Sequence, residues 1–160
     1  MSSAHQNLSA PLHGDALPDG KGKKIGIVCA AWNREITIAL LDGCKEALLK
    51  MGVSSKNIKI MHVPGSFELP YGAARLLQNH PDTDAIITLG CLIRGETIHF
   101  EVIAESVANA LQSLSLQQLK PCIFGVLTTE TEEQAWARAG GKHGNKGEEA
   151  AFTALAMCTF

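Results

Sequence analysis

Four short, mostly apolar runs alternate with segments in which apolar side chains recur at helical spacing. The runs lie at residues 25–30, 57–63, 85–90 and 122–127, and their composition is typical of strands buried on both faces. Apolar stripes at 36–51, 67–79 and 97–116 predict helices between the strands. A capping pattern, Thr131-Glu132-Glu133-Gln134, predicts the start of a fourth helix, and an alanine-rich segment at 148–157 predicts a fifth.

Strands that alternate with helices of this length predict one α/β domain with a parallel sheet and helices on both faces. Residues 1–22 lack the pattern and are rich in Ser, Ala, Pro, Gly and His, so we expect a flexible N-terminal arm before a single domain at 23–160. In such sheets ligands bind beyond the carboxyl ends of the strands. Functional residues are therefore expected directly after each strand.

Composition narrows the functional classes. The 160 residues are 46% hydrophobic and 19% charged, as in a globular domain, and the net charge of −2 argues against nucleic acid or an anionic membrane as the main partner. No apolar run reaches the roughly 18 to 20 residues that span a bilayer, and the start has no signal-peptide pattern, so we expect a cytoplasmic protein. Five cysteines without a C-x-x-C pair predict buried, reduced thiols, and the scattered histidines predict no metal site.

Aromatic residues follow the first two predicted strands. Trp32 stands where the chain should turn, which favours either a flat platform for a flat ligand or a lid over the sheet edge. Phe67 and Glu68 follow the second strand and could stack on and hydrogen-bond to a polyhydroxylated heteroaromatic ligand. Alternatively, Phe67 begins the core face of the second helix and Glu68 interacts with its dipole.

The segment after the third strand predicts an anion site. The backbone amides of Gly95, Glu96 and Thr97 are expected to open a helix, and Thr97 adds a hydroxyl donor. The carboxylate of Glu96 should repel an anion, so its side chain is expected to point away. His99 follows within reach of the same site and can transfer a proton at neutral pH.

A glycine-rich, basic segment at 138–147 allows three interpretations. Arg138 could clamp a phosphate. The segment Gly144-Asn145-Lys146-Gly147 matches the G-x-x-G pattern of an RNA-binding KH loop, although the net charge opposes that function. The third interpretation is a solvated turn between helices.

Several of these motifs, taken in order, resemble the 6,7-dimethyl-8-ribityllumazine synthase family. The resemblance runs from about residue 24 to 157 and rests on these segments: Trp32-Asn33, Pro64-Gly65-Ser66-Phe67-Glu68-Leu69-Pro70, residues 90–100, Phe124-Gly125-Val126-Leu127-Thr128-Thr129-Glu130, and Arg138-Ala139-Gly140 with Gly144-Asn145-Lys146-Gly147. It implies a flavodoxin-like three-layer sandwich around a central four-stranded parallel sheet. It also implies pentamers, with active sites between subunits, and closed shells of 60 subunits in some members.

The implied activity is that of a transferase in riboflavin biosynthesis. The family condenses 5-amino-6-ribitylaminouracil with 3,4-dihydroxy-2-butanone 4-phosphate to give 6,7-dimethyl-8-ribityllumazine, phosphate and water, without a metal or organic cofactor. A further implied partner, besides the substrates and other copies of the chain, is riboflavin synthase. The competing interpretation is a non-catalytic lumazine or flavin carrier that uses the same pocket.

The resemblance also implies a role for each matching residue. His99 matches the proton-transfer residue. The phosphate site is matched by Gly95, Glu96, Thr97 and Arg138. The pyrimidine and ribityl site is matched by Trp32, Ser66, Phe67, Glu68, Leu92, Ile93, Phe124 and Lys146. Among these, Phe124 and Lys146 match groups supplied around a subunit boundary.

Overall fold

Four parallel strands form the centre of the protein, whose computed structural model describes residues 17–160. They are β1 (Ile25–Ala30), β2 (Ile58–Val63), β3 (Ala85–Ile93) and β4 (Cys122–Thr129). The strands lie in the order β2-β1-β3-β4, and every neighbouring pair is parallel. The predicted parallel sheet is therefore confirmed. Residues 1–16 of the predicted arm lie outside the described residues.

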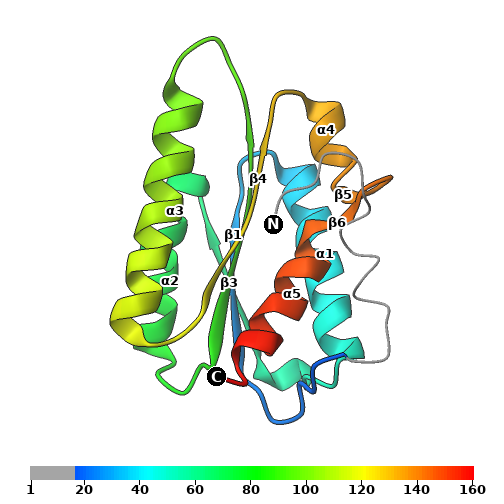
Figure 1. Cartoon of the computed structure of the whole chain (residues 1–160), viewed down its shortest axis with the longest axis vertical. Helices are drawn as coiled ribbons and strands as arrows, with labels where there is room; N and C mark the ends of the chain where they lie inside the picture. The colour runs from blue at the N-terminus through cyan, green and yellow to red at the C-terminus, as the bar shows by residue number, and fades with distance from the viewer. Residues whose placement is uncertain (1–16) are drawn as a thin grey trace.

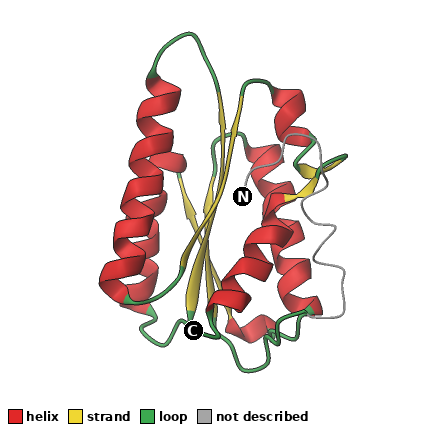
Figure 2. Cartoon of the chain, viewed as in Figure 1, coloured by secondary structure: helices red, strands yellow, loops and turns green. Residues whose placement is uncertain are grey.

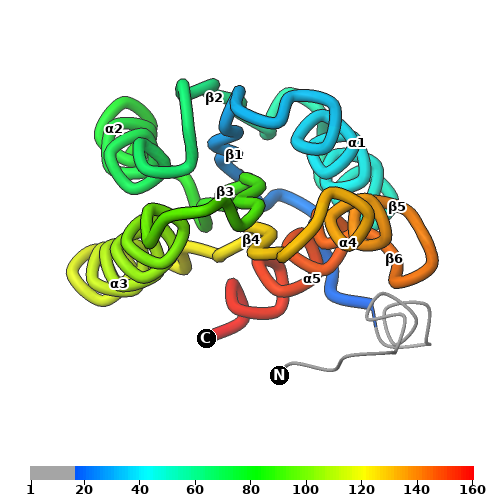
Figure 3. Tube along the Cα trace, turned by 90° about the horizontal axis from the view of Figure 1, so that it is seen from above, coloured from blue at the N-terminus to red at the C-terminus, as the bar shows by residue number. Residues whose placement is uncertain are grey.

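Helices cover both faces of the sheet (Figures 1 and 2). Seen from above, α1 (Arg34–Lys50) and α5 (Lys146–Met157) lie on one face, while α2 (Leu69–Asn79) and α3 (His99–Gln118) lie on the other (Figure 3). The short helix α4 (Glu132–Trp136) follows β4. This arrangement is the expected three-layer sandwich. None of the helices among residues 17–160 has the length and apolar character needed to cross a membrane.

Two apolar cores, one on each side of the sheet, explain why the central strands are apolar throughout. Side chains of β1 alternate between the faces: Ile25 and Ile27 pack in the core beneath α1 and α5, whereas Val28 and Ala30 pack in the core beneath α2 and α3. Every residue of β1 is buried, so a polar side chain on either face of this strand would lose stability unless it found a hydrogen-bond partner.

The ends of several elements differ from the prediction. The third strand, expected to end at Gly90, continues to Ile93 because Cys91, Leu92 and Ile93 pair with the last residues of β4. The helix expected from Thr97 begins at His99, after an irregular segment. The second helix is preceded by a 3₁₀ turn at Ser66–Glu68, so it begins at Leu69 rather than at 67.

The glycine-rich segment at 138–147 contains regular structure. A small hairpin of β5 (Ala139–Gly141) and β6 (Gly144–Asn145) occupies it, and α5 begins at Lys146, earlier than expected. The predicted capping box of α4 is half formed: the Thr131 hydroxyl accepts a bond from the Gln134 amide at 3.3 Å. The Gln134 side chain instead accepts a bond from the Glu130 amide at 2.9 Å.

Candidate functional site

A cavity of about 730 Å³ lies at the carboxyl ends of β1, β2 and β3. It is formed by the segments that follow these strands, by the last residues of β3 and by the first turns of α3. The strand order reverses between β1 and β3, and this switch point is where parallel α/β sheets bind ligands, because the connections leave toward opposite faces. The volume is in the range of small-molecule sites.

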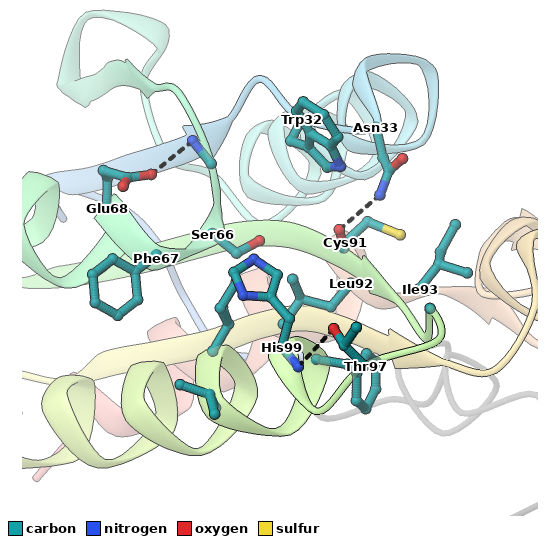
Figure 4. Close-up of a pocket in the computed structure, with 15 residues that line it drawn as sticks. Trp32, Asn33, Ser66, Phe67, Glu68, Cys91, Leu92, Ile93, Thr97 and His99 are labelled. Carbon is teal, nitrogen blue, oxygen red and sulfur yellow. Dashed lines mark hydrogen bonds between the residues drawn. The ribbon is translucent and has the colours of Figure 1, made fainter.

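Most of the predicted site residues meet at this cavity. Those that line it are Trp32, Ser66, Phe67, Glu68, Leu92, Ile93, Gly95, Thr97 and His99. In Figure 4, His99 extends from the start of α3 into the pocket, and Trp32 lies on the opposite side. Asn33, Phe100 and Val102 also line the cavity, although the sequence analysis assigned them no role. Phe100 and Val102 lie in α3, the helix that begins at the predicted site residue His99.

The two aromatic side chains belong to the cavity and not to the core. Trp32 is 71% exposed and Phe67 is 57% exposed, although both line the pocket. The interpretation of Phe67 as the first core residue of the second helix is therefore wrong. Large exposed aromatic faces inside a cavity are suited to stacking on a flat ligand.

Asn33 holds the Trp32 turn in place. Its backbone is left-handed, with φ 54° and ψ 49°, a conformation that asparagine tolerates better than most residues. Its side-chain amide donates a hydrogen bond to the Cys91 carbonyl oxygen at 2.9 Å (Figure 4). This bond connects the turn after β1 to the end of β3. An asparagine directly after a strand was the available sequence signal.

The turn after β2 combines a satisfied carboxylate with an unsatisfied hydroxyl. The Glu68 carboxylate accepts a bond from the Gly65 amide at 3.0 Å, so it closes the turn as well as lining the pocket. The Ser66 hydroxyl is buried and has no hydrogen-bond partner among residues 17–160. It lies against Gly90, where an added Cβ would come within 2.5 Å of Ser66 Oγ. A buried hydroxyl without a partner at a cavity wall is suited to a polar group of a ligand.

The segment between β3 and α3 contributes Gly95 and Thr97 to the cavity. Glu96 lies between them, is exposed, and is not among the lining residues. The Thr97 hydroxyl accepts a bond from the His99 amide at 3.4 Å, as Figure 4 shows. The amides of Gly95, Glu96 and Thr97 thus precede the helix, whereas the sequence predicted that they would open it.

The thiols of the protein are free and largely buried, as predicted. Cys91 lines the cavity, and burial raises the pKa of its thiol to about 11, with a smaller contribution from Glu132. A thiol with this pKa is protonated at neutral pH and is a poor nucleophile. Within residues 17–160, no three His, Cys, Asp or Glu side chains are grouped so that they could hold a metal ion.

Besides Glu96, three predicted site residues are not among those that line the cavity. Phe124 packs against the core under α2 and α3. Arg138 follows α4 and donates a bond to the Gln134 carbonyl oxygen at 3.0 Å. Lys146 begins α5 and pairs with Glu149 at 3.0 Å. Consequently no Arg or Lys side chain of the described residues lines the cavity.

The G-x-x-G segment is part of the contact between α1 and α5. The Asn145 side chain donates a bond to the Ala39 carbonyl oxygen at 3.0 Å and accepts one from the Gly147 amide at 2.8 Å. Asn145 and Gly147 are both buried. A loop that packs inside the domain cannot lay its backbone on RNA, so this observation argues against the KH-like interpretation.

A parallel sheet with this strand order and a cavity at its switch point defines an α/β protein of the flavodoxin-like class. The family model of 6,7-dimethyl-8-ribityllumazine synthase matches residues 22–160. The chain therefore belongs to the 6,7-dimethyl-8-ribityllumazine synthase family, which confirms the resemblance seen in the sequence.

Individual relatives agree over nearly the whole length. A protein of that name from Porphyromonas gingivalis is 50% identical over 157 residues, covering 98% of this chain and 96% of the relative. One from Parabacteroides distasonis is 47% identical over 160 residues, covering 100% and 99%. One from Thermus thermophilus is 50% identical over 137 residues, covering 86% and 87%.

Proposed function

We propose that this chain catalyses the condensation of 5-amino-6-ribitylaminouracil with 3,4-dihydroxy-2-butanone 4-phosphate, giving 6,7-dimethyl-8-ribityllumazine, phosphate and water. The observation that carries the proposal is the switch-point cavity of a family member, in which exposed aromatic faces, polar side chains and His99 converge. The enzyme is a transferase of riboflavin biosynthesis. Its amine and ketone substrates condense to a Schiff base, phosphate leaves, and ring closure releases the lumazine.

Each part of the cavity is assigned to one part of the substrates. Trp32 stacks on the pyrimidine, and the backbone of Leu92 and Ile93 hydrogen-bonds to its edge. Ser66, Phe67 and Glu68 hold the ribityl chain, for which the unpartnered Ser66 hydroxyl is suited. His99 moves protons between the reacting amine and carbonyl groups. Holding two reactive substrates in register supplies much of the rate, because the amine and the ketone need little activation.

Within residues 17–160, the cavity of a single chain lacks a cation to bind the phosphate group. Gly95, Glu96 and Thr97 present backbone amides, with Gly95 and Thr97 at the cavity wall. A dianion also needs a cation, and Arg138 is not among the residues that line the cavity of its own chain. We therefore infer that Arg138, Phe124 and Lys146 complete the cavity of a neighbouring subunit.

This division requires self-association. We propose pentamers, as the family resemblance implies, with a shell of 60 subunits as the larger form. Exposed apolar side chains on and beside α3 support it: Ile98 is 75% exposed, Val102 is 50% exposed and Leu119 is 89% exposed. Sedimentation measures the assembly, and a monomer at micromolar concentration contradicts the shared site. We further propose a cytoplasmic location and an interaction with riboflavin synthase, which consumes the product.

Mixing the protein with both substrates and following lumazine fluorescence tests the activity against the alternative of a non-catalytic carrier. Binding of lumazine without its formation would favour the carrier. His99→Ala should leave measurable activity because positioning dominates. Arg138→Ala should raise the KM of the phosphorylated substrate about 10- to 100-fold, the loss expected for a charge-assisted hydrogen bond. An unchanged KM removes Arg138 from the phosphate role.

A further inference from the structure

Arg94 lies at the point where the chain leaves β3 and enters the segment that contributes to the cavity wall. It follows the last residue of β3 and begins the segment 94–98 that leads to α3. Its backbone amide donates a bond to the Thr129 carbonyl oxygen at 2.9 Å, which extends the pairing of β3 with β4 by one residue. Figure 1 shows this connection and the junction of β4 with α4 at the same end of the sheet.

The Arg94 side chain contacts three groups from two other parts of the fold. Its Nε donates to the Glu130 carboxylate, at 2.9 Å from Oε1 and 2.8 Å from Oε2. Its Nη1 donates to Oε1 of Glu101, in the first turn of α3. Its guanidinium carbon lies 4.5 Å from the centroid of the Phe100 ring, a cation–π distance. One guanidinium therefore connects the end of β4 to the start of α3.

These contacts engage the charge of Arg94 outside the cavity lining. Arg94 is not among the residues that line the cavity, and two carboxylates occupy its guanidinium. Glu130 is itself anchored, because its amide donates to the Gln134 side chain at 2.9 Å. The second oxygen of Glu101 is buried and has no partner among residues 17–160, although the Glu101 side chain as a whole is 40% exposed.

The segment that Arg94 begins has little support of its own. Residues 94–99 are all exposed, and an added Cβ on Gly95 would meet nothing within 4 Å. The hydrogen bond from the His99 amide to the Thr97 hydroxyl, at 3.4 Å, is longer than the usual limit of about 3.2 Å and is therefore weak. The conformation of the segment thus depends on the contacts made at its ends.

We propose that Arg94 is a positioning residue, which holds the segment 94–98 and the first turn of α3 in the geometry that binds the phosphorylated substrate. It acts through Glu130, Glu101 and Phe100 and touches no substrate. The identity of that substrate rests on the proposed function. The restraint that Arg94 places on the segment does not depend on it.

The kinetic test compares Arg94→Gln, Arg94→Lys and Glu130→Gln. A matched control, Lys24→Gln, removes an exposed ion pair with Asp82 that precedes the amino end of the sheet. Arg94→Gln should raise the KM of the phosphorylated substrate and lower kcat, by about 10- to 100-fold in kcat/KM, since small misplacements carry such costs. The KM of the pyrimidine substrate should stay within about twofold, because Trp32 and Ser66 do not depend on the segment. Arg94→Lys should recover part of the loss, and the control should match the wild type.

Amide hydrogen exchange of Arg94 and Val102 in the ligand-free protein supplies a readout independent of activity, because these amides donate to the Thr129 and Ile98 carbonyl oxygens at the two ends of the segment. Their exchange should accelerate in Arg94→Gln and Glu130→Gln, but not in the Lys24 control. The Arg94→Gln/Glu130→Gln double variant should exchange no faster than Arg94→Gln alone. Unchanged exchange overturns the inference, as do equal changes in both KM values. If the wild type forms no lumazine but exchange responds as stated, the proposed function fails and the positioning role stands.

Discussion

Among the glycines of residues 17–160, Gly147 is the one at which an added methyl group should lower the stability of the fold most. It lies at the start of α5, where α5 crosses α1, and a Cβ there would come within 1.9 Å of the Leu40 carbonyl oxygen. The obstacle is backbone in a fully buried part of α1, so no side-chain rotation can relieve the contact. The same Cβ would lie 2.9 Å from Asn145 Oδ1, which accepts the Gly147 amide. Gly147→Ala must therefore push the two helices apart.

The expected cost follows from these contacts. Overpacking a core costs about 1–3 kcal/mol, and disturbing the hydrogen bond between Asn145 and Gly147 costs about 1 kcal/mol more. The better helix propensity of alanine offsets up to about 1 kcal/mol. With the full propensity offset, the net destabilisation should be about 1–3 kcal/mol. For a chain of this size, that lowers the Tm by about 2–12 °C.

Thermal and denaturant unfolding, at matched protein concentration, measure the effect, because self-association would otherwise shift the Tm. The control is Gly95→Ala, the same substitution at a site where a Cβ meets nothing within 4 Å. Its stability should stay within about 0.5 kcal/mol of the wild type. If Gly147→Ala melts with the wild type, or if both variants fall equally, the packing argument is refuted.

Two further predictions concern the cavity. Trp32→Ala should raise the KM of the pyrimidine substrate by about 5- to 100-fold, the range for loss of an aromatic stacking partner. Trp32→Phe should keep most of the affinity, and both should leave the Tm unchanged since Trp32 is 71% exposed; a large Tm loss contradicts the assignment. Burial raises the Cys91 pKa from 9.0 to about 11, so its thiolate fraction at neutral pH is about 100-fold lower in the folded chain than in the unfolded chain. Iodoacetamide labelling followed by mass spectrometry should show at least that slowing, and labelling at the unfolded rate contradicts it.

Much of the site could be predicted because parallel α/β sheets bind ligands at one edge. Once the apolar runs placed the strands, the residues that follow them were the candidates, and Trp32, Phe67 and His99 do meet at one cavity. Phe100 and Val102 were missed because helix residues at the cavity are indistinguishable in sequence from residues of the helix core face. The length of β3 was underestimated because Ile93 is in a strand only through its pairing with Thr129.

By itself, the sequence determined the alternation of strands and helices, the apolar cores and the family. These depend on the spacing of residues close together in the chain and on short motifs, which can be recognised without knowledge of the fold. Only the tertiary structure decided that the Asn145 side chain connects α5 to Ala39, more than 100 residues earlier in the chain, and that Arg94 pairs with Glu130 and does not line the cavity. It also placed Phe124, Arg138 and Lys146 away from the cavity of their own chain. The physical reason is that hydrogen bonds and charge pairs between distant segments depend on which face each segment presents, and linear spacing does not encode that choice.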